Sequence, residues 1–285
     1  MRTGSSRCAA IMPSGAGALW PQPGSGLHNR GMEVTDGFEL TLAEHVATLT
    51  LNRPAKRNAV TAAMWRALPG ILADLAADPK VRVLILTGAG GTFCSGADIS
   101  EIHELGDNDD DTGITVVAEH ALMTFPKPVI AMIEGYCVGG GCQLALACDL
   151  RVAADGARFG VTPAKLGIVY PLSSTRRLAE IAGPATAKLL LFSAELIDAD
   201  HALRTGLVDE VRRPEDLRDR VYGLAATMAG RSRLTLTAAK QIVDGRAGEA
   251  EVRAWQREAR ESGEIAEGVR AYREGRSPGF SWHAK

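Results

Sequence analysis

Three consecutive glycines, Gly139, Gly140 and Gly141, stand where one apolar run ends and another begins. The run before them, 128–133, is typical of a buried strand, and the run after them, 144–148, is typical of a short helix. Glycines in such a turn allow positive φ and let a ligand approach the backbone closely. The free N–H groups at the helix start, backed by the helix dipole, suit an anion or a developing negative charge. The turn thus predicts either an anion site or close packing of a helix on a sheet.

A second turn of the same kind lies upstream, with the sequence FCSGADI at 93–99. It also follows an apolar run, 81–87, and opens a polar segment that we expect to be helical. Neither turn has the spacing of a dinucleotide-binding or Walker-type loop. Two such turns could direct two backbone N–H groups at one oxygen atom.

Composition limits the classes of function. The 285 residues have a net charge of −2, which gives no electrostatic case for a nucleic acid or an anionic membrane surface. No apolar run approaches the roughly 18 residues that span a bilayer. The five cysteines form no C-x-x-C pair, so we expect neither a disulfide framework nor a zinc site, and we expect reduced thiols in a cytoplasmic protein. The acidic run at 106–113 is typical of a solvated loop rather than a metal site.

The chain divides into three parts. Residues 1–32 contain no Asp or Glu and are rich in Gly, Ser, Pro and Ala, which predicts a disordered extension, with a transit peptide as the weaker alternative. In residues 33–212 strands alternate with helices, which favours an α/β core with mostly parallel pairing. Residues 213–285 predict a helical region that packs on the core or on a neighbouring subunit. The expected strands are 38–42, 46–51, 81–87, 128–133, 149–154, 157–160 and 207–211. The expected helices before the tail are 61–77, which Thr61 could cap, 114–124, 174–182, 185–192 and 198–205.

Several segments together resemble the crotonase (enoyl-CoA hydratase/isomerase) superfamily, in its order and spacing, from about residue 37 to 280. They are NRP at 52–54 with NA at 58–59, FCSGADI at 93–99, GYCVGGG at 135–141 with CD at 148–149, RL at 177–178, and EGVRAYREGRSPGF at 267–280. The resemblance implies a spiral of ββα units with a C-terminal α-helical region. It also implies trimers that often pair into hexamers, an acyl-coenzyme A thioester as substrate, and no separate cofactor or metal.

The resemblance implies roles for particular residues. Ala97 and Gly140 would be the backbone N–H donors to the thioester oxygen, as the two convergent turns also suggest. Lys56 and Arg57 would lie in the coenzyme A loop, where cations suit phosphates, and Ala59 would offer backbone contacts near the adenine. The remaining positions implied for substrate binding are Gly96, Asp98, Ile99 and Pro163, together with Arg276 and Phe280 of the tail, which often act across a subunit boundary.

The chain departs from the family at two positions that matter for chemistry. Hydratases of the family carry two glutamates that hold and deprotonate water, and Gln143 and Pro163 stand at those positions here. An amide and a proline ring do not titrate near neutral pH, which argues against water addition by the usual pair.

The segment 162–170 is similar to that of methylmalonyl-CoA decarboxylase-like members, in which a tyrosine at the position of Tyr170 lines the pocket. Decarboxylation needs no base to form the enolate, and Gln143 and Tyr170 could serve as hydrogen-bonding groups. Glu101, His103 and Glu104 could supply a substitute acid or base, although their place in a helix favours a surface role.

Three hypotheses therefore stay open. The first is a crotonase-class enzyme acting on an acyl-CoA, with hydratase/isomerase as the broad label, the usual water-activating pair missing and a lyase or isomerase reaction favoured. The second is a decarboxylase that uses Tyr170, and the third is a non-catalytic acyl-CoA-binding paralogue. None of them involves a nucleic acid or a membrane as partner.

Overall fold

The computed structural model describes residues 32–35, 37–106 and 113–282. The extension predicted at 1–32 lies outside this part of the chain except for Met32, the first residue of strand β1. The acidic loop predicted at 106–113 lies outside it except for its two end residues.

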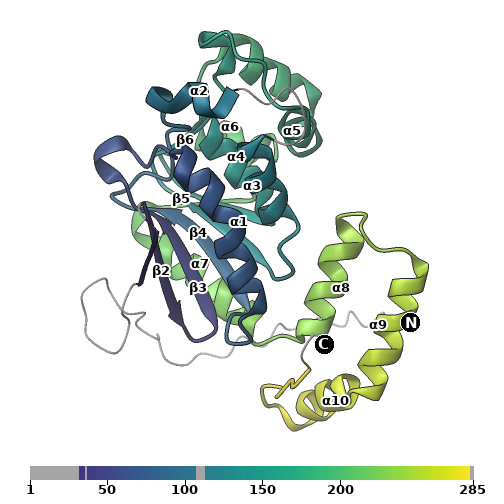
Figure 1. The fold of residues 1–285 in the computed structure, drawn as a ribbon. Coiled ribbons are helices and arrows are strands. Elements are labelled where there is room, and N and C mark those ends of the chain that lie inside the picture. The colour runs from purple at the N-terminus through teal and green to yellow at the C-terminus, as the bar shows by residue number, and fades with distance from the viewer. Residues whose placement is uncertain (1–31, 36, 107–112, 283–285) are drawn as a thin grey trace, which may run out of the picture.

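A seven-stranded sheet forms the centre of the protein, with the order β1-β2-β3-β4-β5-β7-β10 (Figure 1). The first three strands pair antiparallel, and every pair from β3 onward is parallel. The strands are β1 (Met32–Thr35), β2 (Phe38–Ala43), β3 (Val46–Leu51), β4 (Val83–Gly88), β5 (Val129–Ile133), β7 (Leu150–Ala154) and β10 (Glu210–Arg212). The predicted α/β class with mostly parallel pairing is therefore confirmed, although β10 begins three residues later than expected.

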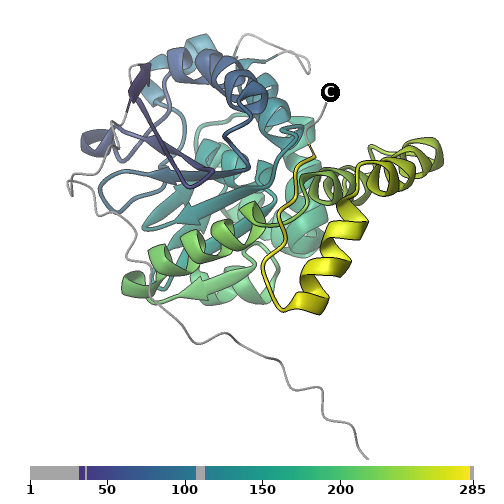
Figure 2. The same ribbon diagram turned by 90° about the horizontal axis from the view of Figure 1, so that it is seen from below.

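Alternate residues of the parallel strands face two separate cores. Leu84 and Leu86 of β4 pack in the core that contains α1 (Ala62–Ala77), α3 (Ile114–Met123) and α4 (Gly140–Ala147). Val83 and Ile85 pack in the other core, with α7 (Pro214–Ala229). Helices thus cover both faces, and the sheet lies between them (Figure 2).

A smaller sheet carries the glycine-rich turn. It consists of β6 (Tyr136–Val138), β8 (Arg158–Gly160) and β9 (Ile197–Asp198). The sequence predicts only β8, since strands of two or three residues are too short to show an alternating pattern. Strand β6 leads directly into Gly139 and α4, so this sheet fixes where the turn points.

The helices largely follow the sequence pattern. Thr61 Oγ1 accepts a hydrogen bond from Met64 N at 3.2 Å, so the predicted cap of α1 is confirmed. The two helices expected at 174–182 and 185–192 join as α5 (Leu172–Ser193) across a kink at Gly183, where φ is 78°. The shorter helices are α2 (Ile102–Gly106) and α6 (Ala199–Arg204), with 3₁₀ turns at Pro54–Lys56, Ile99–Glu101 and Pro163–Lys165.

The last three helices stand off the core (Figure 1). They are α8 (Arg233–Val243), α9 (Glu249–Glu261) and α10 (Glu264–Glu274). Lys240 Nζ of α8 donates to Asp149 Oδ2 at 2.9 Å and to Lys127 O at 3.2 Å, which anchors the tail. Helix α7 packs on the sheet although it follows residue 213, and the division predicted at that residue stays a prediction. No helix of the described residues has the length and apolar character needed to cross a membrane.

The anchor gives a test of stability. The side chain of Lys240 is 7% exposed, and burial raises the pKa of Asp149 while Lys240 opposes that rise. A Lys240→Met variant leaves the carboxylate without its cation and should lose about 3 kcal/mol of unfolding free energy at pH 7, measured by urea denaturation. Since a raised pKa means that the folded state holds the proton more tightly, the loss should shrink as the pH falls through the acid range. Lys188→Met, at an exposed position of α5, is the control, with an expected change below about 0.5 kcal/mol. An equal loss in both variants would contradict this account.

Candidate functional site

Two strand-to-helix turns meet at the centre of the site. Cys94 of the first turn pairs with Cys137 of β6 as an isolated parallel bridge. Cys94 N donates to Tyr136 O at 2.8 Å, and Val138 N donates to Cys94 O at 2.9 Å. These hydrogen bonds hold the first turn alongside β6, the strand that leads into the second turn.

A glycine with positive φ precedes the key residue of each turn. Gly96, with φ of 116°, precedes Ala97, and Gly139, with φ of 54°, precedes Gly140. A Cβ atom at Gly96 would lie 3.2 Å from Val138 O, so both conformation and space favour glycine there. Gly139 therefore places the Gly140 N–H at the start of α4, and Gly96 places the Ala97 N–H just before Asp98, the N-cap of the 3₁₀ turn at 99–101.

The amides of Ala97 and Gly140 lie close together. A Cβ atom built on Gly140 would lie 3.3 Å from Ala97 N, and one built on Gly96 would lie 3.7 Å from Gly140 N. In the described part of the chain neither amide has an acceptor, whereas the neighbouring Asp98 N donates to Val60 O at 2.9 Å. Two free donors side by side, one of them at the N-terminus of α4, can hold one oxygen that carries negative charge.

The loop with Lys56 and Arg57 is fixed against the first turn by Asn58. Asn58 is fully buried with φ of 57°, and its Nδ2 donates to Ala89 O at 2.8 Å and to Thr92 O at 2.5 Å. Its Oδ1 accepts from Arg53 N at 2.9 Å. One side chain thus satisfies three backbone groups of two loops.

Lys56 and Arg57 themselves are exposed beside this turn. Ser95 N donates to Arg57 O at 3.0 Å, and the Arg57 guanidinium lies 5.3 Å from the centroid of the Tyr136 ring. The predicted cationic loop and the predicted oxyanion turn are therefore neighbours, and both cations are available to an anionic ligand.

Asp98, Arg53 and Ala59 form a structural link between the same loops. Arg53 Nη1 donates to Asp98 Oδ2 at 3.0 Å and to Ala59 O at 2.6 Å. The Ser100 hydroxyl and then Arg53 hold the pKa of Asp98 below its usual range. Ile99, next to Asp98, is 63% exposed and offers an apolar surface beside the turn.

Gln143 lies in the first turns of α4 and is buried. Its Nε2 donates to Glu119 Oε2 at 3.0 Å and to Thr115 O at 3.3 Å. Glu119, on α3, is buried too, and no motif in the sequence points to it. The only signal in the sequence is a carboxylate inside the otherwise mostly apolar helix 114–123, which by itself is also typical of a solvated helix face.

Tyr170 contacts the second turn. Its hydroxyl donates to Gly139 O at 3.3 Å, and burial raises its pKa well above the usual range. The hydroxyl therefore stays protonated and braces the backbone next to Gly140. Pro163, the other position implied by the resemblance, starts a 3₁₀ turn and is half-buried.

The alternative acids near the first turn are engaged elsewhere. Glu101 Oε2 accepts from Ala62 N at 2.7 Å and so caps α1. Glu104 pairs with Arg66 at 3.1 Å on the surface, and His103 is exposed.

The tail segment that holds Arg276 and Phe280 follows α10, which lies apart from α1 and α4 of its own chain (Figure 1). Arg276 Nη1 pairs with Glu267 Oε1 at 2.6 Å, and its Nε pairs with Glu274 Oε2 at 2.6 Å. The structure therefore does not bring these two residues together with Lys56 and Arg57 within one chain.

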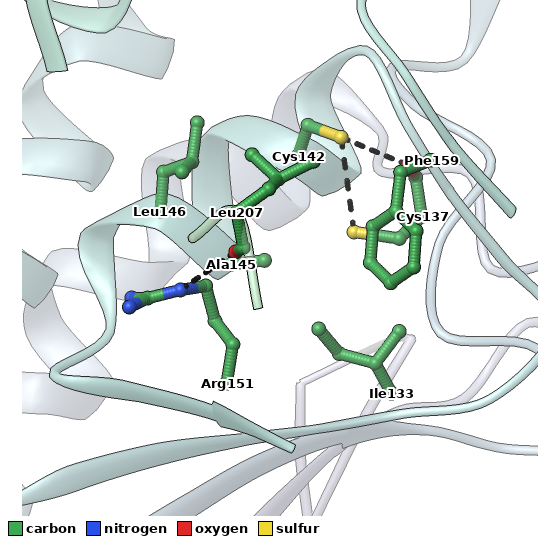
Figure 3. Close-up of a pocket in the computed structure, with 8 residues that line it drawn as sticks. All are labelled: Ile133, Cys137, Cys142, Ala145, Leu146, Arg151, Phe159 and Leu207. Atoms are coloured by element: carbon green, nitrogen blue, oxygen red, sulfur yellow. Dashed lines mark hydrogen bonds between the residues drawn. The ribbon is translucent and has the colours of Figure 1, made fainter. Parts of the chain in front are cut away.

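A thiol-rich region lies beneath α4. Eight side chains, among them Cys137, Cys142 and Phe159, surround a space too small for a water molecule (Figure 3). Cys142 Sγ donates to Cys137 O at 2.8 Å, and burial raises the pKa of Cys137 well above its usual value. These buried thiols fill the core under the helix and form no ligand pocket. Among the residues described, no cluster of His, Cys, Asp or Glu could hold a metal ion.

Fold and site together define an α/β protein in which two glycine turns present paired backbone donors. The sequence model of the enoyl-CoA hydratase/isomerase family matches residues 41–283. The chain belongs to this family, the crotonase superfamily.

Individual relatives of known sequence or structure support the same family. A short-chain-enoyl-CoA hydratase of Clostridium acetobutylicum is 36% identical over 204 residues, which cover 70% of this chain and 77% of the relative. A 2,3-dehydroadipyl-CoA hydratase of Escherichia coli is 40% identical over 203 residues, 70% of this chain and 78% of the relative. The crystal structure of an enoyl-CoA hydratase of Bacillus anthracis superposes with a TM-score of 0.76 at 30% identity, covering 86% of this chain and 98% of that one. The predicted crotonase-like fold is therefore confirmed.

The role of Asn58 can be tested by its removal. Asn58→Ala leaves three backbone groups without their partner and places alanine at positive φ, so we expect a loss of about 3 kcal/mol or more of unfolding free energy. Urea denaturation measures it. Asn52→Ala, at an exposed position of the same loop, should change the unfolding free energy by less than about 0.5 kcal/mol. A loss at Asn58 no larger than at Asn52 would show that the loops are held by other contacts.

Proposed function

We propose that the protein is an enzyme that binds an acyl-CoA thioester and stabilises its enolate between the amides of Ala97 and Gly140. The observation that carries this proposal is the pair of adjacent N–H groups that lack acceptors in the described chain. The thioester oxygen gains negative charge when an enolate forms, so fixed donors stabilise the transition state more than the substrate. The loss of one such donor typically costs about 2.7–4 kcal/mol.

The surroundings of the two amides suit this substrate class. Lys56 and Arg57 are exposed on the loop beside the first turn, where they can bind the phosphates of coenzyme A. The backbone of Ala59 follows in the same loop. No metal or separate cofactor enters this proposal.

The reaction that we favour is a lyase or isomerase reaction of the enolate. The relatives named above are hydratases, but Gln143 and Pro163 provide no titratable group for activating water. A decarboxylase that uses Tyr170 is the second candidate, since a neutral hydroxyl lies 3.3 Å from Gly139 O, next to the oxyanion donors. The third candidate is a non-catalytic acyl-CoA-binding protein, which would be favoured if the protein binds thioesters but converts none of them.

We also propose that the protein acts as a homotrimer, or as a hexamer of two trimers. Apolar side chains are exposed on α5, α8 and α10, including Phe192 at 75%, Val243 at 84% and Tyr272 at 89%. Contacts between subunits would cover such groups, and they would let Arg276 and Phe280 reach the coenzyme A bound to a neighbouring chain. Size-exclusion chromatography with light scattering measures the assembly, and a monomer at micromolar concentration would contradict this part.

The reaction is identified by incubating the purified protein with a mixed library of acyl-CoA thioesters and following each by mass spectrometry and retention time. Gain of water indicates hydration, loss of carbon dioxide indicates decarboxylation, and a shifted retention time at unchanged mass indicates isomerisation. Hydration of crotonyl-CoA at rates normal for the family would contradict the weight placed on Gln143 and Pro163. Decarboxylation that disappears in Tyr170→Phe would support the second candidate.

The paired amides are tested by Gly140→Ala. The added methyl would lie 3.3 Å from Ala97 N and 2.9 Å from Trp65, so it enters the space between the donors. We expect turnover of whichever thioester is converted to fall by about 100-fold or more. Gly223→Ala, in α7 with no atom within 4 Å of the added carbon, is the control and should keep wild-type turnover. Thermal melting checks that both variants are folded, and full turnover in folded Gly140→Ala would contradict the proposed oxyanion site.

A further inference from the structure

Glu119 has one carboxylate oxygen that the protein itself leaves without a partner. Its Oε2 accepts hydrogen bonds from Ser174 Oγ at 2.6 Å, from Gln143 Nε2 at 3.0 Å and from Ser173 Oγ at 3.1 Å. Its Oε1 is fully buried and has no hydrogen-bond donor in the described chain, and the residue is 1% exposed. A buried acceptor without a donor costs about 1–3 kcal/mol, so such an atom calls for a ligand or a chemical role.

The carboxylate lies beside the proposed oxyanion site. Gln143, one hydrogen bond away, follows Gly140 by three residues, and residues three apart share one face of a helix. Tyr170, which contacts Gly139 O, is close enough for the charge of Glu119 to help raise its pKa. Ser173 and Ser174 belong to the first turn of α5. Glu119 thus contacts the first turn of α4 and the first turn of α5. The Gly140 amide lies at the same end of α4.

Glu119 also explains the amide at position 143. A glutamate there would place a second carboxylate at about the 3.0 Å separation now seen between Gln143 Nε2 and Glu119 Oε2. Two like charges at that distance disfavour each other, whereas the amide donates a hydrogen bond. In this chain the carboxylate beside the first turn of α4 therefore comes from α3.

The other acid–base candidates near the site are engaged or cannot titrate. Gln143 and Pro163 have no titratable proton, and the hydroxyl of Tyr170 is held protonated by burial. Glu101 caps α1, and Glu104 pairs with Arg66. Among these side chains only Glu119 has a buried carboxylate oxygen without a hydrogen-bond partner in the described chain.

We propose that Glu119 is the proton-transfer group of this site and that the enzyme isomerises unsaturated acyl-CoA thioesters. The inference rests on the proposed function. Glu119 Oε1 takes a proton from the α-carbon of a 3-enoyl thioester. The C–H electron pair forms the dienolate, whose oxygen accepts hydrogen bonds from Ala97 and Gly140. The same oxygen of Glu119 then returns the proton to the γ-carbon, which gives the conjugated 2-enoyl thioester and regenerates the carboxylate. One carboxylate is sufficient for this reaction, and no water or other reactant is consumed.

The test uses the full-length protein with 3-hexenoyl-CoA in deuterium oxide. The formation of the conjugated thioester is followed by its absorbance, and deuterium incorporation at carbon is followed by mass spectrometry. Glu119→Gln keeps the size and the acceptor for both serines but removes the base, so both rates should fall about 100-fold or more. Thioester binding by calorimetry and the melting temperature should stay at wild-type values. Glu119→Asp should recover part of the rate, and Glu104→Gln, a surface carboxylate, should keep all of it.

The possible outcomes separate this inference from the proposed function. If Glu119→Gln keeps a rate within about threefold of wild type while Gly140→Ala loses it, Glu119 is not the base, and the oxyanion site stands. If Glu104→Gln loses the rate instead, the base lies on α2. If the wild-type protein binds the thioester but neither isomerises it nor incorporates deuterium, this inference fails, and the thioester library then decides the proposed function separately.

Discussion

The pairing of Cys94 with Cys137 is the contact on which the site depends. It aligns two turns about 40 residues apart in sequence, and the free amides of Ala97 and Gly140 meet only because the strands before them lie side by side. Gly141 secures this arrangement, since a Cβ atom there would overlap Cys94 O. The buried thiols below α4 fill the remaining space, so the helix can pack closely on β6, the strand that leads into it.

The fold was largely predictable from sequence, because its long strands and helices carry clear periodicity. Strands β2 and β3 and helix α1 appear where the apolar pattern and Thr61 predict them. The short strands β6 and β9 were not predictable, since two or three residues show no period. The break inside α5 was predictable, because the sequence predicts two helices, 174–182 and 185–192, and the non-helical Gly183 separates them in the structure.

The site was predictable only where backbone geometry determines it. The glycine turns indicate free backbone amides from the sequence alone. The motif at 52–59 likewise indicates the loop that carries Lys56 and Arg57. Glu119 could not be found, because its importance depends on side chains from α4 and α5 that meet it only in the folded chain. A carboxylate in a helix looks the same in sequence whether it faces solvent or a buried amide. Arg276 and Phe280 are the opposite case: their motif is clear in the sequence, whereas they follow α10, a helix that lies apart from α4 within one chain.

The attachment of the tail has a mechanical consequence. The hydrogen bonds found between the three tail helices and the core involve α8 and the residues just after it, through Thr237, Lys240 and Arg246, while α9 and α10 have none to the core within the described residues. The tail is therefore attached to the core at one end only. A small rotation at the α7–α8 junction produces a larger displacement at α10, which lies farther from the attachment. A molecule that binds α10 can therefore transmit force through Lys240 to Asp149. Asp149 precedes β7, and its carboxylate accepts a hydrogen bond from the first amide of β5.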